Sequence, residues 1–186
     1  MKRLLKAVLV VLSCYFIAVI SNLVFLEQIV VYGSSMETTL ANGEFGLADK
    51  QIFKITSLKR FDIVVIQDND EKIIKRLIGL PNETITYSNG VLKVNGYVVE
   101  ESFIDDINKN QTTRNDKDIS ITLKEDEYFV LGDNRKISYD SRNFGPIKKE
   151  NIKARLFVIY GKCENLVCDS NSMCECKRKY FRPVFI

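Results

Sequence analysis

Histidine is missing from this chain of 186 residues. A catalytic serine in it would lack its commonest general base, so the Ser-His-Asp arrangement is excluded. Lysine is the known substitute, provided that its surroundings lower its pKa. A serine hydrolase built on this sequence would therefore have to use a lysine as its base.

The chain also has little net charge. Its 27 basic and 24 acidic residues leave a formal charge of +3, and the only dense basic cluster is Lys177 to Lys179. Such a small, dispersed charge does not favour binding to DNA or RNA. We therefore expect no nucleic-acid partner. The 46% hydrophobic and 27% charged content suits one modest globular domain.

Charge is absent altogether from Ala7 to Leu26, a run of 20 residues. At about 1.5 Å per residue a helix of this length spans about 30 Å, the thickness of a bilayer's hydrocarbon core. Basic residues precede the run and Glu27 follows it, which places residues 1–6 in the cytoplasm and the rest outside. We expect a single-pass anchor in the cell membrane. The alternative is a cleaved signal peptide, for which Ala18 to Ser21 is a poor cleavage site.

No strong amphipathic helix follows residue 27, and runs of β-branched residues separated by turn signals predict a mostly β domain. The predicted strands are Ile29–Val31, Ile63–Ile66, Ile73–Ile78, Val91–Val99, Tyr128–Leu131 and Leu156–Tyr160. Glu100 to Ser120 is almost continuously polar, which predicts a mobile excursion rather than core.

Lys75 is the lysine whose surroundings could lower its pKa. Strand alternation puts it on one face with Ile73 and Leu77. Lowering a lysine pKa from about 10.4 to the range of a useful base costs roughly 4 kcal/mol, which burial can supply. The alternative is an edge strand whose lysine reaches water. The candidate nucleophile is Ser35, nine residues beyond Leu26 and therefore within about 30 Å of the membrane.

Four segments then occur in order: Gly33 to Leu40 (GSSMETTL), Arg60 to Val65 (RFDIVV), Ile74 to Pro81 (IKRLIGLP) and Gly132 to Gly145 (GDNRKISYDSRNFG). This set resembles the serine box, the R-G-D-I-V-V strand, the lysine box and the G-D-N-R-x-x-S-x-D-S-R box of the bacterial type I signal peptidases. The resemblance covers roughly residues 4 to 160.

The resemblance implies a single N-terminal transmembrane helix (7–26) followed by a β-rich extracytoplasmic catalytic domain (27–160), with 82–124 as a small inserted cap. It implies a membrane-bound serine endopeptidase that cleaves N-terminal signal peptides from exported preproteins after small residues. Its partners would be these preproteins and the lipid bilayer. Neither a cofactor nor a metal is expected.

The resemblance also implies roles for single residues. Ser35 would be the nucleophile, its backbone N–H an oxyanion donor, and Lys75 the general base oriented by Ser138. Four charged residues would hold the last loop together: Asp133, Arg135, Asp140 and Arg142. Three apolar residues would line shallow substrate pockets, although a core could equally hold them: Met36, Leu40 and Ile74.

Two residues depart from the family pattern. Thr38 stands where the family has proline, which frees the backbone after the nucleophile at a cost of about 0.4–1 kcal/mol of preorganisation. Phe61 stands where it usually has glycine. If that glycine serves a positive φ, phenylalanine requires a shifted backbone.

Residues 161–186 form a basic tail outside the resemblance, with four cysteines: Cys163, Cys168, Cys174 and Cys176. An extracytoplasmic location favours two disulfides, with a zinc site and free thiols as alternatives. The divergent boxes and this tail also leave open a non-catalytic scaffold for assembling secreted or pilus-type proteins. A self-cleaving repressor is disfavoured because no DNA-binding helical domain is present. Retention of Ser35, Lys75 and Ser138 favours the peptidase.

Overall fold

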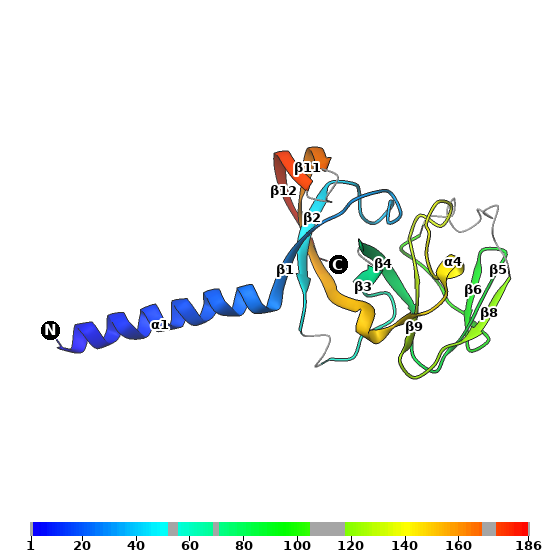
Figure 1. Cartoon of the computed structure of the whole chain (residues 1–186), viewed down its shortest axis with the longest axis horizontal. Coiled ribbons are helices and arrows are strands. Elements are labelled where there is room, and N and C mark those ends of the chain that lie inside the picture. The colour runs from blue at the N-terminus through cyan, green and yellow to red at the C-terminus, as the bar shows by residue number, and fades with distance from the viewer. Residues whose placement is uncertain (1, 52–55, 69–70, 105–117, 169–173, 186) are drawn as a thin grey trace.

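The computed structural model describes residues 2–51, 56–68, 71–104, 118–168 and 174–185, and side chains within 4–17, 25–51, 56–68, 71–104 and 118–163. Helix α1 (Lys2–Phe25) extends away from the body of the protein and leads directly into strand β1 (Leu26–Val30) (Figure 1). Within the described part of the chain, a search for a helix both long and apolar enough to cross a membrane finds none.

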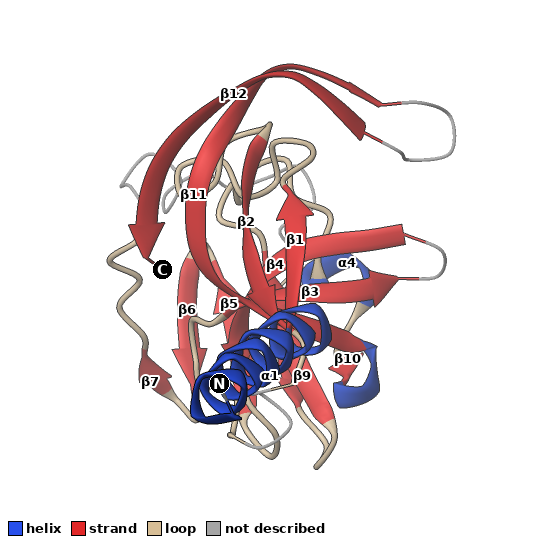
Figure 2. Ribbon diagram, turned by 90° about the vertical axis from the view of Figure 1, so that its left-hand side faces the viewer, coloured by secondary structure: helices blue, strands red, loops and turns tan. Residues whose placement is uncertain are grey.

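The body is built on an antiparallel sheet of eight strands in the order β1-β2-β11-β3-β4-β9-β10, with β12 paired to β11 (Figure 2). After β1 its strands are β2 (Glu44–Asp49), β3 (Ile63–Asp68), β4 (Glu71–Gly79), β9 (Glu127–Leu131), β10 (Ile147–Lys148), β11 (Ile152–Cys168) and β12 (Cys174–Phe185). Two short helices, α4 (Ser141–Phe144) and the 3-10 helix η1 (Lys149–Asn151), flank β10.

A second, four-stranded sheet forms the cap, far from α1 in Figure 1. Its order is β7-β6-β5-β8, with β5 (Thr84–Ser88), β6 (Val91–Val94), β7 (Tyr97–Val98) and β8 (Ile119–Thr122). The turns Asn89-Gly90 and Asn95-Gly96 have positive φ at both residues, as two-residue hairpins require. All four strands lie within the predicted insertion, 82–124.

Three apolar clusters hold the fold together. The first joins β1, β2, β3 and β11, and the second joins β3 and β4 to β9 and β10. The third joins the cap to the main sheet: it combines Ile85, Tyr87 and Leu92 with Phe129 and Leu131 of β9. The cap is therefore fixed to the strand that leads into the last sequence box.

The mostly β prediction is confirmed, and each predicted strand overlaps an observed one. The run Val91–Val99 divides into β6 and β7 because of the turn at Asn95-Gly96. Strands β2, β5, β8, β10 and β12 were not predicted; β10 has only two residues, and β8 begins inside a polar stretch. The prediction of a mobile excursion was wrong at its start, since Glu101 and Ile104 are 4% and 3% exposed. Residues 105–117 lie outside the described ranges.

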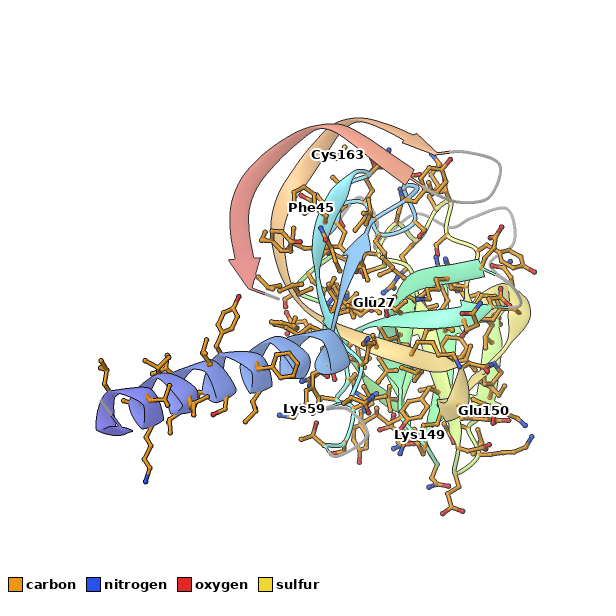
Figure 3. The ribbon with its side chains drawn as sticks, turned by 60° about the vertical axis from the view of Figure 1, so that its left-hand side comes forward. Glu27, Phe45, Lys59, Lys149, Glu150 and Cys163 are labelled. Atoms are coloured by element: carbon orange, nitrogen blue, oxygen red, sulfur yellow. The ribbon has the colours of Figure 1, made fainter. Side chains whose placement is uncertain are left out.

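The expected boundary at residue 160 does not separate two units, because β11 is one strand of 17 residues that crosses it. With β12 it forms a long curved arm (Figure 2). Cys163 lies at the base of this arm near Phe45 (Figure 3). It is buried and disulfide-bonded, and the side chain of its partner lies outside the described set. Cys14 on α1 is a free thiol.

Candidate active site

Lys75 lies in the middle of the main sheet, on β4. Val64 of β3 pairs directly with it, and its neighbours on the same face, Ile73 and Leu77, belong to the second apolar cluster with Val64. Its side chain is withdrawn from water, with 4% of the residue exposed. The predicted face is therefore the observed one, and the edge-strand alternative does not hold.

This burial lowers the pKa of Lys75 from its ordinary value of 10.5. Removal from water is the largest cause, because it disfavours the ammonium form. The charge of Arg142 acts in the same direction, and those of Asp140 and Asp133 oppose it. Among the described residues no hydrogen bond or ion pair to the Lys75 side-chain amine occurs. The amine is thus poised to lose its proton.

Ser35 lies half-buried in the loop between β1 and β2. The ends of this loop are tied together: Val31 N donates to Glu44 O at 2.7 Å, and Gly33 N donates to Asn42 Oδ1 at 2.9 Å. Beyond the serine the chain turns tightly, with Leu40 N donating to Met36 O at 2.8 Å. The loop presents Ser35 from a closed, supported turn.

Gly132 lies beside Ser138 and the backbone of Ser35, directly after strand β9, which pairs with the strand of Lys75. Arg76 pairs with Leu131, and continuing this antiparallel register by one residue places Gly132 across from Lys75. A Cβ at Gly132 would collide with Ser138 Oγ and lie 2.5 Å from the Ser35 carbonyl oxygen. Because residues across a ladder share a face, the Lys75 side chain points to the same face of the sheet as the space beside Gly132, which the Ser138 hydroxyl and the Ser35 carbonyl border.

Ser138 is buried, and its Oγ has no hydrogen-bond partner among the residues that the structure describes. A buried hydroxyl without a partner costs free energy, so its retention here calls for an explanation. Its position beside Gly132, across from Lys75, suits an oxygen that accepts a hydrogen bond from the lysine amine. The same amine can then be held in one orientation toward Ser35.

The loop that carries Gly132 and Ser138 is tied down by a buried carboxylate. Asp140 caps α4 and accepts from Gly132 N at 3.0 Å and from Arg142 Nε at 2.9 Å. Arg142 also donates to the carbonyl of Arg135 at 2.7 Å. Asp140 is 0% exposed. The loop therefore closes on itself through charge-assisted bonds, which are the stronger kind.

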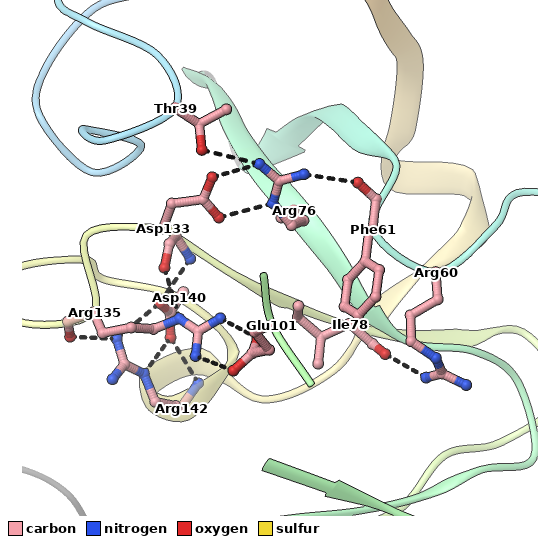
Figure 4. A network of polar contacts seen from close by, with 11 residues as sticks. Thr39, Arg60, Phe61, Arg76, Ile78, Glu101, Asp133, Arg135, Asp140 and Arg142 are labelled. Atoms are coloured by element: carbon pink, nitrogen blue, oxygen red, sulfur yellow. Dashed lines mark hydrogen bonds and ion pairs between the residues drawn. The ribbon is translucent and has the colours of Figure 1, made fainter. Parts of the chain in front are cut away.

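Arg76 links three segments (Figure 4). It donates to both carboxylate oxygens of Asp133, at 2.9 and 2.6 Å, to Thr39 Oγ1 at 3.1 Å and to the Phe61 carbonyl at 3.0 Å. A further bond joins the last loop to the nucleophile, from Asn134 N to Ser35 O at 3.0 Å. The lysine strand, the nucleophile loop and the last loop are thereby held in one register.

Arg135 and Glu101 form a second buried ion pair (Figure 4). Arg135 Nη1 donates to Glu101 Oε2 at 2.9 Å, a second, shorter bond joins Nη2 to Oε1, and Arg135 Nε donates to Gly132 O at 3.1 Å. Four residues of this network were not predicted from the sequence: Glu101, Thr39, Arg76 and Gly132. Arg76 could have been identified from the sequence, since a charged residue inside an apolar strand needs a buried partner.

The two departures from the family pattern have definite conformations. Phe61 itself adopts φ +74, so the expected shift of the backbone is wrong: the phenylalanine accepts the left-handed conformation. Thr38 has φ +95, which the ring of a proline cannot reach. The loop after the nucleophile therefore follows a path in this chain that a proline at position 38 would not allow.

The three candidate pocket residues do not behave alike. Met36 and Leu40 are each 1% exposed in the first cluster, so their side chains support the nucleophile loop from inside. Ile74 is half-buried against the same cluster. Within the described ranges no group of three or more potential metal ligands occurs.

Comparison with known proteins identifies the family of this chain. The family model described as "Signal peptidase, peptidase S26" matches residues 2–161. The chain belongs to this family. It is 41% identical over 142 residues to signal peptidase I V of Bacillus subtilis (strain 168), covering 72% of this chain and 84% of that protein.

Other members of the signal peptidase family match as well. Signal peptidase I P of Bacillus subtilis subsp. natto is 37% identical over 158 residues, 80% of this chain and 82% of the relative. A crystal structure of a signal peptidase I from Enterococcus faecalis V583 is 35% identical, with a TM-score of 0.48 over 54% of this chain and 97% of that one. The arm beyond residue 161 lies outside the family match.

Proposed function

We propose that this protein is a membrane-bound serine endopeptidase that removes signal peptides from exported preproteins after small residues, with Ser35 as nucleophile and Lys75 as general base. The single observation that carries the proposal is the buried, unpaired Lys75 beside Gly132, where Ser35 and Ser138 converge. Family membership supports it, since the relatives are named signal peptidases I.

In the proposed reaction the neutral Lys75 amine takes the hydroxyl proton of Ser35 while Oγ attacks the scissile carbonyl carbon. The resulting oxyanion accepts a hydrogen bond from the backbone N–H of Ser35. Lys75 then gives its proton to the departing amine, and the C–N bond breaks. Water, deprotonated by the same amine, attacks the ester carbonyl; the bond between the acyl carbon and Oγ breaks, and Lys75 returns the proton to Ser35 Oγ.

A lowered lysine pKa serves both halves of this cycle. The amine must be neutral to accept a proton at physiological pH, and its conjugate acid must be strong enough to protonate the leaving group. Burial among Val64, Ile73 and Leu77 supplies this property without a histidine. Ser138 is proposed to orient the amine, and Asp133, Arg135, Asp140 and Arg142 to keep the loop in place.

The membrane anchor is part of the proposal and rests on the uncharged run from Ala7 to Leu26, which α1 contains almost entirely. Basic residues before the run place the N-terminus in the cytoplasm. β1 follows α1 without a linker, so the anchor would hold Ser35 near the bilayer, where precursors are concentrated. Val30 and Tyr32, 37% and 73% exposed, suit contact with the lipid interface.

The preference for small residues before the cut follows from steric exclusion by a shallow site, which needs no buried charge. Among the pocket candidates, Ile74 remains the one with an accessible surface, so we propose it as the direct contact.

The test is cleavage of signal-peptide precursors by the detergent-solubilised full chain, with Ser35→Ala, Lys75→Ala and Lys93→Ala as variants. Lys93 is exposed on the cap and serves as the control. Cleavage after a small residue that the first two variants abolish and the third retains supports the proposal. If folded wild-type protein leaves every precursor intact, the non-catalytic scaffold becomes the better account.

A further inference from the structure

One short segment that follows the cap strand β7, Glu101 to Ile104, contacts the polar network of Arg76 and Arg135. A turn closes this segment, with Ile104 N donating to Glu101 O at 3.2 Å. Glu101 and Ile104 are buried, and Phe103 packs against the third apolar cluster. The segment lies between the cap strand β7 and the residues outside the described ranges, and its two ends are buried.

Phe103 covers the guanidinium of Arg76. The Arg76 Cζ lies 3.9 Å from the centroid of the Phe103 ring, within the range of a cation–π contact. The ring of Phe61 meets Phe103 edge to face, with centroids 4.9 Å apart and planes at 63°. The Phe61 carbonyl accepts from Arg76 at 3.0 Å. The two rings thus shield one side of the Arg76–Asp133 ion pair from water and fix the plane of its guanidinium.

Glu101 acts on the neighbouring arginine. Its carboxylate holds both terminal nitrogens of Arg135, and Arg135 Nε in turn holds the Gly132 carbonyl at 3.1 Å. The turn from Gly132 to Arg135 is therefore held from the cap at two points: at Asp133 through Arg76 and Phe103, and at Gly132 through Arg135 and Glu101. This same turn carries the open space across from Lys75.

We propose that Glu101 and Phe103, together with Phe61, are positioning residues of the peptidase site, acting through Arg135 and Arg76 to fix Gly132 and Asp133 relative to Lys75. The inference rests on the proposed function of Ser35 and Lys75. It makes the cap an integral part of the site, because removing its contacts releases the loop that Lys75 faces.

Phe61 offers an unusually clean test. Its φ of +74 lies in the region that glycine adopts freely and that other residues avoid. Phe61→Gly removes the ring and at the same time relieves the backbone, so loss of folding is not the expected result. Phe61 is held in this conformation by the surrounding structure: its N–H donates to Leu77 O at 2.7 Å, its carbonyl accepts from Arg76, and its ring packs on Phe103.

The experiment is steady-state cleavage of a signal-peptide precursor by the full chain in detergent, with Phe61→Gly, Phe103→Leu, Glu101→Asp and Phe103→Tyr. The control is Val94→Ala, a truncation in the same apolar cluster but on β6. We expect the first three to lower kcat by about ten- to a hundredfold, as small misplacements of catalytic groups do, with KM within about twofold. Phe103→Tyr and Val94→Ala keep the wild-type kcat at temperatures where both are folded.

The double variant Phe61→Gly/Phe103→Leu distinguishes positioning of the site through Arg76 from a general loss of packing. Because both rings act through Arg76, its kcat is expected to match that of Phe103→Leu alone, so that the two effects are not multiplied. If Phe61→Gly and Phe103→Leu keep kcat within about twofold of Val94→Ala, the inference is overturned. The proposed function still stands in that case, provided that the wild-type protein cleaves the precursor and Ser35→Ala does not. No cleavage by folded wild-type protein overturns both.

Discussion

Arg76 holds Asp133 by two hydrogen bonds, Nε to Oδ1 at 2.9 Å and Nη2 to Oδ2 at 2.6 Å, with both side chains almost fully withdrawn from solvent. Arg76 follows Lys75 directly on β4, and Asp133 follows Gly132 directly. The pair therefore fixes the lysine strand against the last loop at the point where the site forms. A buried ion pair of this kind contributes more to geometry than to net stability, because desolvation offsets most of its attraction.

Arg76→Met tests this pair, since it leaves the Asp133 carboxylate buried without a partner. We expect the free energy of unfolding to fall by about 3–5 kcal/mol. Lys72→Met on the same strand breaks an exposed pair with Glu27, and should cost about 0–1 kcal/mol. Denaturant unfolding of both variants measures the contrast. Equal losses would mean that the Arg76–Asp133 pair behaves like a surface contact.

Gly132→Ala tests the open space across from Lys75. The added methyl group meets Ser138 Oγ and the Ser35 carbonyl, so we expect overpacking of about 1–3 kcal/mol and a loss of cleavage of more than about tenfold. Gly96→Ala in the cap turn is the control: its φ of +85 disfavours alanine, but nothing lies within 4 Å of the new atom. It should cost stability and leave kcat unchanged. Retention of full activity by Gly132→Ala would show that the space is not part of the site.

Ser138→Ala separates a role in the reaction from a role in folding. The Ser138 Oγ is buried with no partner, so its removal should leave stability unchanged or raise it slightly. Cleavage should fall nevertheless, by about ten- to a hundredfold, because the Lys75 amine loses its orientation. Thermal unfolding and kcat measured on the same samples give both values. A parallel fall in stability and activity would assign Ser138 to packing alone.

Lys75→Met tests the burial of the amine through stability. The folded-state pKa of Lys75 is lowered, so between that pKa and 10.5 the unfolded chain binds more protons than the folded one. The free energy of unfolding of the wild type therefore rises with pH between these two pKa values. At lower pH the buried, charged Lys75 destabilises the folded protein. We expect Lys75→Met to be more stable at pH 7, with a gain that shrinks as pH approaches 10.5. Lys93→Met, at an exposed position, should show no such trend; an identical trend in both would refute the lowered pKa.

The sequence predicted the strand that carries Lys75 because alternation fixes which side chains share a face, and Ile73 and Leu77 lie where alternation put them. The loop of Gly132 to Gly145 was predicted from its resemblance to a family box, since its own residues read as a solvated turn. Glu101 could not be found in this way. Its neighbours are polar, and only the tertiary pairing with Arg135, 34 residues away, makes it core.

The left-handed Phe61 was equally beyond sequence reasoning. Local preference argues against φ +74 for phenylalanine, and the contacts that hold it there come from Leu77, Arg76 and Phe103 in other parts of the chain. The arm of β11 and β12 was missed for a different reason. Its cysteines predicted disulfides and its basic residues gave no strand pattern, whereas a ladder pairs Val158–Cys168 of β11 with Cys174–Phe185 of β12.

The most direct test of the Ser35/Lys75 account is the pH dependence of kcat/KM for a signal-peptide precursor between about pH 6 and pH 10. A neutral lysine base predicts a rate that rises with pH along one limb, set by a pKa below 10.5, and that levels off once Lys75 has lost its proton. A rate that stays flat across the whole range would contradict Lys75 as the base that activates Ser35.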